Sequence, residues 1–170
     1  MHRFRISGSG IGVSATHRAY GVTPPERLKE MSGLDFLAAI AAGELPMPPI
    51  SGTLDFRLCE VAPGRAVFRG TPATAFYNPL GSVHGGWYAT LLDSCMACAV
   101  QSTLPKGSGY TTLEFKINLL RAITAETGPV EAVGTVVQAG RRIGVAEGRL
   151  SDGDGKLLAH GSTTCLIFEL

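Results

Sequence analysis

The segment from Leu91 to Val100 constrains the fold most, because it is apolar on almost every side. A helix that is hydrophobic all round belongs inside a protein, so we expect a buried central helix over about residues 86–103. A single carboxylate, Asp93, interrupts the apolar run. A buried carboxylate is costly unless it is hydrogen-bonded, paired or used in chemistry, which makes Asp93 a candidate functional residue.

Gly85 and Gly86 lie where this helix is expected to begin. The first backbone N–H groups of a helix have no acceptor within it, and glycine lets a ligand approach them closely. The segment therefore predicts free donors at the positive end of the helix dipole, with a carboxylate about two turns further along. The same residues also fit an alternative, in which the glycines only mark a turn and Asp93 is a satisfied core residue.

The composition sets broad limits on the class of protein. A chain of 170 residues suits one domain with a sizeable core. With a net charge of +1 and no basic stripe, we expect no nucleic-acid partner. No apolar run is long enough to span a bilayer, and Ser-Gly-rich sequence follows Arg3 and Arg5 where a secretory signal needs an apolar region. We therefore expect a cytoplasmic protein without a membrane partner.

The cysteines do not predict a metal site. All four of them, Cys59, Cys95, Cys98 and Cys165, lie among apolar residues, as reduced core thiols do in the cytosol. Cys95 and Cys98 form a Cys-x-x-Cys pair, but a zinc site needs a second pair or nearby histidines. The pair also falls in the middle of the expected helix, whereas a redox motif begins one. We therefore expect neither a metal nor a redox cofactor.

Residues 1–50 are expected to form an extension that precedes a main domain over residues 51–170. Glycines and prolines interrupt the first 30 or so residues, part of which we expect to be disordered or to lie over the domain. Ser32 is a candidate N-cap with Asp35 after it, and Gly43 is a candidate C-cap. These signals predict a short amphipathic helix over about residues 32–42, followed by a stiff Pro-rich linker.

Alternating apolar residues predict two strands, over residues 54–61 and 65–70, joined in a hairpin at Pro63-Gly64. Four more strands are expected after the central helix, over residues 110–120, 130–139, 142–151 and 156–168. Turns at Gly140-Arg141 and at residues 152–155 predict that these four form a meander. The predicted class is α+β, with one antiparallel sheet wrapped around one long helix.

This order of elements, with His84-Gly85-Gly86 opening the central helix, resembles the hotdog fold. The closest likeness is to acyl-CoA thioesterases of the phenylacetate-degradation (PaaI) type, over roughly residues 50–168. His-Gly-Gly is a weak signal by itself, but here an Asn lies six residues before the His and an Asp seven residues after the second Gly. The resemblance is carried by residues 78–86, 91–94, 110–114, 140–142 and 159–164.

The resemblance implies a role for each residue of the motif. Asp93 takes the position of the base or nucleophile, and its short arm favours activation of a water over direct attack. The backbone N–H of Gly85 takes the position of the donor that polarises the thioester carbonyl, with Gly86 beside the substrate. Asn78 matches an amide that places water or substrate, and Thr111 matches a hydroxyl near the base.

Other implied roles come with alternatives. His84 orients the loop and the substrate carbonyl in the resembling enzymes, and direct proton transfer is the alternative. Arg141 and Arg142 are expected to clamp CoA phosphate, since Arg binds phosphate in fork geometry, although a solvated turn explains them equally well. The family uses no metal or redox cofactor. It forms homodimers, often as dimers of dimers, with sites at the subunit interface.

The sequence is also compatible with two rival functions. One is a hydratase or dehydratase acting on acyl-CoA or acyl-carrier-protein substrates, whose hotdog relatives pair an Asp with a differently placed His. The other is a non-catalytic acyl-CoA-binding module. The sequence leaves the acyl group open, because the resemblance implies a pocket lined by side chains from two subunits. His160 is interpreted as structural, and His2 and His17 belong to the N-terminal segment.

Overall fold

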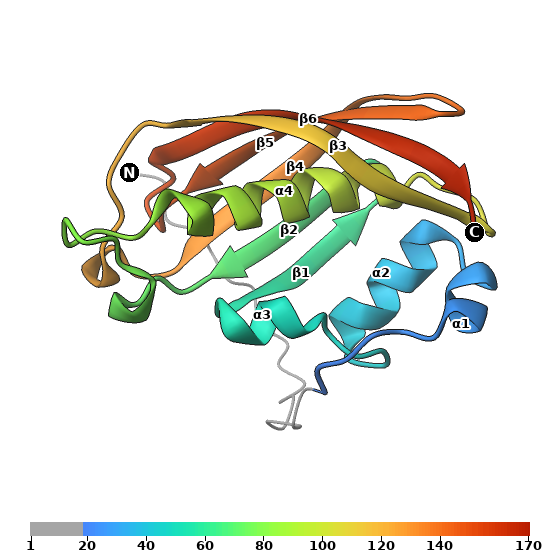
Figure 1. The fold of residues 1–170 in the computed structure, drawn as a ribbon, viewed down its shortest axis with the longest axis horizontal. Helices are drawn as coiled ribbons and strands as arrows, with labels where there is room; N and C mark the ends of the chain where they lie inside the picture. The colour runs from blue at the N-terminus through green and yellow to red at the C-terminus, as the bar shows by residue number, and fades with distance from the viewer. Residues whose placement is uncertain (1–18) are drawn as a thin grey trace.

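The computed structural model describes residues 19–170 as one antiparallel sheet curled around a long helix, α4 (Gly85–Gln101) (Figure 1). His2 and His17 lie outside the described residues. The predicted class, with a sheet wrapped around a central helix and a short helical region before it, is confirmed. The strands are β1 (Phe56–Ala62), β2 (Arg65–Gly70), β3 (Ser108–Leu119), β4 (Val130–Ala139), β5 (Ile143–Ser151) and β6 (Leu157–Glu169).

The strand order is β1-β2-β4-β5-β6-β3, so the expected four-stranded meander is wrong. Tight turns join β4 to β5 and β5 to β6, as predicted, but β3 pairs with β6 at the far edge. The connection from β3 to β4 is too long for a tight turn and contains a short 3-10 helix, η2 (Ala125–Thr127), so it carries the chain across to β2. The two edges of the sheet are therefore β1 and β3.

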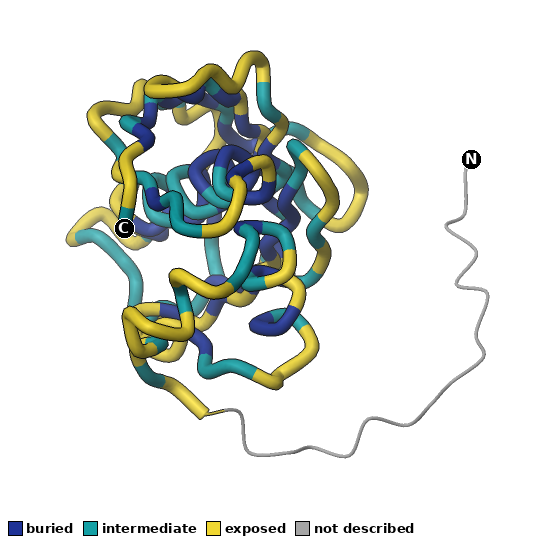
Figure 2. Tube along the Cα trace, turned by 90° about the vertical axis from the view of Figure 1, so that its right-hand side faces the viewer, coloured by how far each residue is buried: buried dark blue, intermediate teal, exposed yellow. Residues whose placement is uncertain are grey.

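Glycines on the concave face let α4 approach the sheet. A Cβ at Gly134 would overlap the backbone carbonyl of Cys95, and one at Gly144 would overlap the Val100 side chain. Because these positions carry no side chain, the helix packs directly on β4 and β5 and buries most of its surface. Figure 2 shows the buried segments gathered in the interior. This burial explains why α4 is hydrophobic on nearly every side.

The predicted amphipathic helix is α2 (Gly33–Ala42). The Ser32 hydroxyl accepts a hydrogen bond from the Asp35 N–H at 3.2 Å, and Gly43 ends the helix with a φ of 81°. Two further helices, α1 (Pro25–Lys29) and α3 (Pro49–Thr53), were not predicted. Both begin at a proline, which the first helical position tolerates because its missing N–H would have no partner there. Prolines interpreted as interruptions or linker therefore start helices.

The described part of the extension, residues 19–50, packs onto the rest of the structure. The Gly33 N–H donates to the Leu104 carbonyl at 3.0 Å, which joins the start of α2 to the chain beyond the end of α4. Leu37 and Ile40 of α2 are buried, and α2 and α3 lie beside β1 (Figure 1). The predicted boundary between residues 50 and 51 falls inside α3, and the division into two regions stays a prediction.

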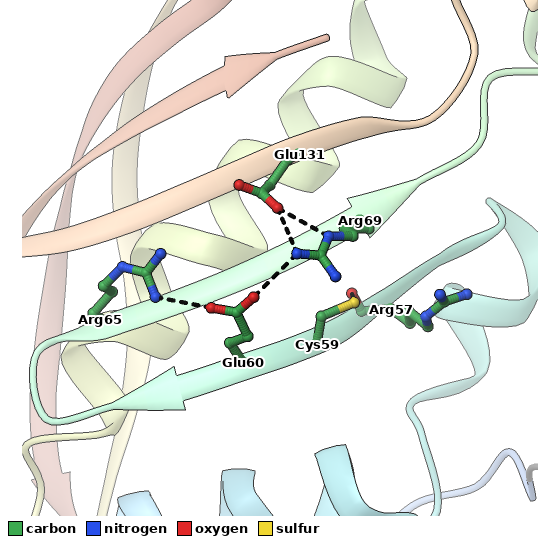
Figure 3. A network of polar contacts seen from close by, with 6 residues as sticks. All are labelled: Arg57, Cys59, Glu60, Arg65, Arg69 and Glu131. Carbon is green, nitrogen blue, oxygen red and sulfur yellow. Dashed lines mark hydrogen bonds and ion pairs between the residues drawn. The ribbon is translucent and has the colours of Figure 1, made fainter. Parts of the chain in front are cut away.

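Ion pairs link three strands at the β1 side of the sheet (Figure 3). Glu60 accepts from Arg65 at 3.3 Å and from Arg69 at 3.0 Å, and Arg69 also pairs with Glu131 at 2.8 Å. These side chains are 39–50% exposed, so each pair contributes little to stability. These ion pairs therefore lie on a solvent-exposed face of the sheet.

Among residues 19–170, no helix combines the length and hydrophobicity that a membrane span requires.

Candidate active site

Asp93 lies midway along α4 and is half-buried. The Thr112 hydroxyl on β3 donates a hydrogen bond to Asp93 Oδ1 at 2.9 Å. Burial raises the pKa of the Asp93 carboxyl, and the hydrogen bond from Thr112 lowers it in part. Within residues 19–170, no cation pairs with Asp93 and no hydrogen bond is made to its second oxygen. A carboxylate in this setting has a strengthened affinity for a proton and one oxygen free to receive it.

The hydroxyl beside Asp93 belongs to Thr112, so the prediction that Thr111 lies near the carboxylate is wrong by one residue. Thr111 is exposed, because neighbouring residues of a strand point to opposite faces of the sheet. Both threonines belong to the resembling phrase at residues 110–114, and only the pairing register of β3 with β6 decides which of them faces α4.

His84 is the N-cap of α4. Its Nδ1 accepts a hydrogen bond from the Gly86 N–H at 2.9 Å. A ring nitrogen that accepts carries no proton, so a neutral His84 carries its proton on Nε2 and donates from there. This geometry fits an orienting residue better than a base. Because the Gly86 N–H already donates to His84, it is not available for the predicted contact of Gly86 with the substrate. A Cβ on Gly86 would lie 3.1 Å from His84 Nδ1 and press on the cap.

Gly85 keeps a free donor. Its N–H has no acceptor within residues 19–170, as expected at the first position of a helix. It lines a small cavity of about 250 Å³ together with Asn78, Tyr88 and Leu119. Gly85 is not among the glycines with positive φ, so the backbone conformation does not require it. A Cβ would lie 2.9 Å from Leu119 Cδ1, inside this cavity wall.

Asn78 shapes the loop that leads into α4. Its side-chain oxygen accepts from the Leu80 N–H at 2.8 Å, and its amide donates to the Ser82 hydroxyl at 3.1 Å. The structure places Asn78 beside Gly85, in the same small cavity, and away from Asp93. We call Asn78 and Gly85 the donor half of the site, and Asp93 and Thr112 the acid half.

The two halves of one chain are too far apart to act on one carbonyl. Gly85 and Asp93 are eight residues apart on α4, which is about 12 Å along the helix axis. Strand β3 runs past both halves, since Leu119 lies against Gly85 and Thr112 binds Asp93. One chain therefore presents two half-sites at the two ends of the same stretch of β3.

Arg141 and Arg142 form the exposed turn between β4 and β5. They line a hollow of about 650 Å³ with Thr103, Ser108 and Phe168, near the C-terminal end of α4. Neither arginine forms an ion pair in the described part of the chain. The hollow is thus a third location along α4, separate from both half-sites.

The aromatic residues next to the motif are held in place by hydrogen bonds and stacking. Trp87 Nε1 donates to the Leu54 carbonyl and the Tyr88 hydroxyl donates to the Arg121 carbonyl, both at 2.9 Å. Phe76 stacks on Trp87 with ring centroids 6.1 Å apart. Within residues 19–170, no group of three or more His, Cys, Asp or Glu side chains is placed to hold a metal.

Comparison with known proteins gives one family. The model of the thioesterase superfamily matches residues 80–159, which include Gly85, Asp93 and Thr112. A Halobacterium salinarum protein predicted to be an esterase is 39% identical over 69 residues, which are 39% of this chain and 44% of the relative. The chain thus spans less than half the length of that curated relative.

Solved structures match over a longer stretch. A phenylacetic acid degradation-related protein of Ralstonia eutropha JMP134 is 32% identical, with a TM-score of 0.70 over 77% of this chain and 98% of that one. A mutant form of the phenylacetic acid degradation protein PaaI of Thermus thermophilus is 28% identical, with a TM-score of 0.63 over 69% of this chain and 97% of that one. With a sheet wrapped around one helix that opens on His84-Gly85-Gly86, the chain belongs to the thioesterase superfamily and has its hotdog fold.

Proposed function

We propose that the protein hydrolyses an acyl-CoA thioester to a free acid and CoA, with Asp93 as the general base. The chain belongs to the thioesterase superfamily, and the observation that carries the proposal is the environment of Asp93 on α4. The carboxyl has a raised pKa, one hydroxyl partner in Thr112 and one free oxygen. Because its polar neighbour is a threonine and not a histidine, the arrangement favours hydrolysis over a hydratase reaction.

The reaction follows from these groups. Asp93 takes a proton from a water whose oxygen attacks the thioester carbonyl carbon. The carbonyl oxygen becomes negatively charged and is stabilised by the N–H of a Gly85 at a helix N-terminus. Collapse of the intermediate breaks the C–S bond, and the departing CoA thiolate takes the proton from Asp93. The products are the free acid and CoA, and no electron transfer is needed.

We further propose that each site is shared between two copies of the chain, because the halves of one chain lie about 12 Å apart. Within residues 19–170, β3 has no strand partner on its outer side, and its side chains Leu113 and Phe115 are 56% and 42% exposed. If two β3 strands pair antiparallel about an axis at Lys116, the bulge at Leu113 brings Thr112 opposite the partner's Leu119. Asp93 of one chain would then meet the partner's Gly85.

Arg141 and Arg142 are proposed to bind CoA phosphate. They are exposed, without ion pairs in residues 19–170, and border a hollow large enough for part of a nucleotide. Replacing both with alanine should raise KM for acyl-CoA and leave KM nearly unchanged for a short pantetheine thioester without the 3′-phosphate. An equal effect on both substrates would contradict the phosphate contact.

Mixing two inactive variants tests both proposals. Asp93→Asn removes the acid half, and Gly85→Ala displaces the carbonyl at the donor half, so each should lose most of its kcat. In a mixed dimer, one of the two sites combines an intact Asp93 with an intact Gly85. After unfolding and refolding together, the mixture should regain about a quarter of the wild-type thiol release.

Two outcomes would overturn these proposals. No recovery on mixing would mean that the halves do not meet across two chains. If the wild-type protein releases no thiol from any acyl-CoA in a broad panel but still binds one, the protein is an acyl-CoA-binding module and not an enzyme.

A further inference from the structure

A cavity of about 300 Å³ lies between the N-terminal extension and the hotdog core. The extension supplies one wall, with Val22, Leu28, Phe36 and Ile40 among its residues. The core supplies the opposite wall, which includes Leu58, Cys98 and Tyr110. No charged side chain lines the cavity, and its volume is at the lower end of the range for small-molecule pockets.

The inner wall of this cavity adjoins the acid half of the site. Tyr110 and Thr112 are two residues apart on β3, so their side chains point to the same face of the sheet. Cys98 follows Asp93 by five residues on α4. Burial, together with the negative charge of Asp93, raises the pKa of the Cys98 thiol to about 12. Thr112, which binds Asp93, is thus next to the cavity-lining Tyr110 on the same face of β3.

The lining excludes the polar part of the proposed substrate. The phosphates of CoA require cations, whereas this cavity offers apolar side chains and, at its inner end, neutral polar groups from Cys98, Gln101 and Tyr110. A thioester whose carbonyl lies at Asp93 has two arms, and only the acyl arm is apolar. The cavity matches that arm.

We propose that this cavity receives an apolar acyl chain of the substrate, and that the N-terminal extension sets the length of chain that fits. The inference rests on the proposed thioesterase activity. Much of the wall lies outside residues 80–159, so this limit comes from residues that the superfamily model does not cover. Each methylene that enters an apolar cavity should favour the substrate by about fourfold, until the cavity is full.

Two variants of the extension should shift the preferred chain length in opposite directions. Leu28→Trp narrows the cavity, and it should lower the ratio of kcat/KM for octanoyl-CoA to that for butyryl-CoA by about tenfold or more. Phe36→Ala enlarges the cavity, and it should move the preference toward longer chains. Lys29→Trp is the matched control, because Lys29 is exposed on α1 and does not line the cavity. Its ratio should equal that of the wild-type protein.

A second substitution guards against misfolding of Leu28→Trp. Val22→Trp also narrows the cavity, from a side chain that is 82% exposed, so it should fold normally and lower the same ratio. If these substitutions leave the chain-length profile unchanged in a protein that hydrolyses acyl-CoAs, the acyl chain lies elsewhere. The thioesterase proposal would survive that result.

Binding measured without turnover separates the two proposals. S-octyl-CoA is a thioether that cannot be hydrolysed, and calorimetry should show that Leu28→Trp weakens its binding relative to S-butyl-CoA. If this shift is seen while no acyl-CoA is hydrolysed, the cavity assignment holds and the thioesterase proposal fails. Equal affinity of the wild-type protein for S-butyl-CoA and S-octyl-CoA would overturn the cavity assignment.

Discussion

The two edge strands of the sheet, β1 and β3, have different surroundings. At β1, helices α2 and α3 lie beside the strand, and Glu60 links Arg65 and Arg69 on β2. At β3, no further strand from the described part of the chain pairs with the edge, and apolar side chains such as Leu113 and Phe115 are exposed. Both half-sites lie along β3, and neither lies along β1. The edge that the described residues leave open is therefore the edge that carries the candidate chemistry.

Because of this difference, we expect the two sides of the molecule to have different roles. The β1 edge is covered within one chain, so its exposed ion pairs should affect stability alone. The β3 side holds a carboxylate and a free helix donor that cannot meet within one chain. A second copy would both cover the exposed edge and complete the site.

The largest effect is expected from blocking the open edge. Replacing Leu113 and Phe115 together with lysine places like charges at the proposed pairing axis, so we expect a monomer by light scattering. Activity should fall about a thousandfold, because each carbonyl loses its helix donor and its alignment. Val137→Lys is the matched control, since Val137 is 60% exposed on β4, away from this edge. A fully active double variant, or a wild-type monomer at micromolar concentration, would contradict the shared site.

Removing the carboxylate should be the next largest effect. Asp93→Asn should lower kcat by about a hundredfold or more, in the range of general-base catalysis. Near-normal turnover would show that Asp93 is a core residue and not the base.

The same variant should be more stable than the wild-type protein at neutral pH. Burial raises the folded-state pKa of Asp93. The folded state therefore loses stability as the pH rises from the unfolded-state pKa through the folded-state pKa. Asparagine does not ionise, so its melting temperature should exceed that of the wild-type protein at pH 7, and the difference should shrink in acid. A lower melting temperature at pH 7 would mean that the ionised carboxylate stabilises the fold.

A smaller effect should separate the two neighbouring threonines. The hydrogen bond from Thr112 lowers the pKa of Asp93, so Thr112→Val should raise that pKa further. Because the base acts when deprotonated, the acid limb of kcat/KM should move to higher pH. Thr111→Val should leave the pH profile where it is. A shift in the Thr111 variant, with none in the Thr112 variant, would reverse the assignment.

The smallest effect is expected at the closed edge. Glu60→Gln breaks two exposed ion pairs, which should cost no more than about 1 kcal/mol of unfolding free energy and less in high salt. The kcat and the oligomeric state should not change. A loss of activity would show that these ion pairs also support the active site.

Local patterns in the sequence determined most of the elements. The apolar run around Asp93 predicted α4, and Ser32 and Gly43 predicted both ends of α2. Strands β4 and β5 lie within about a residue of their expected bounds. These features depend on hydrophobic period and capping chemistry, which neighbouring residues decide. Proline was the exception, because Pro25 and Pro49 signal an interruption as readily as a helix start.

Only the tertiary structure decided how these elements form a candidate site. It selected Thr112 over Thr111 through the register of β3, and it moved β3 to an open edge beside β6. It also separated Gly85 from Asp93 and formed a cavity from residues as distant in sequence as Leu28 and Tyr110. Each of these outcomes depends on contacts between segments far apart along the chain. Such contacts decide which face of the sheet or helix a residue lies on and which residues it contacts there. They leave no local pattern in the sequence.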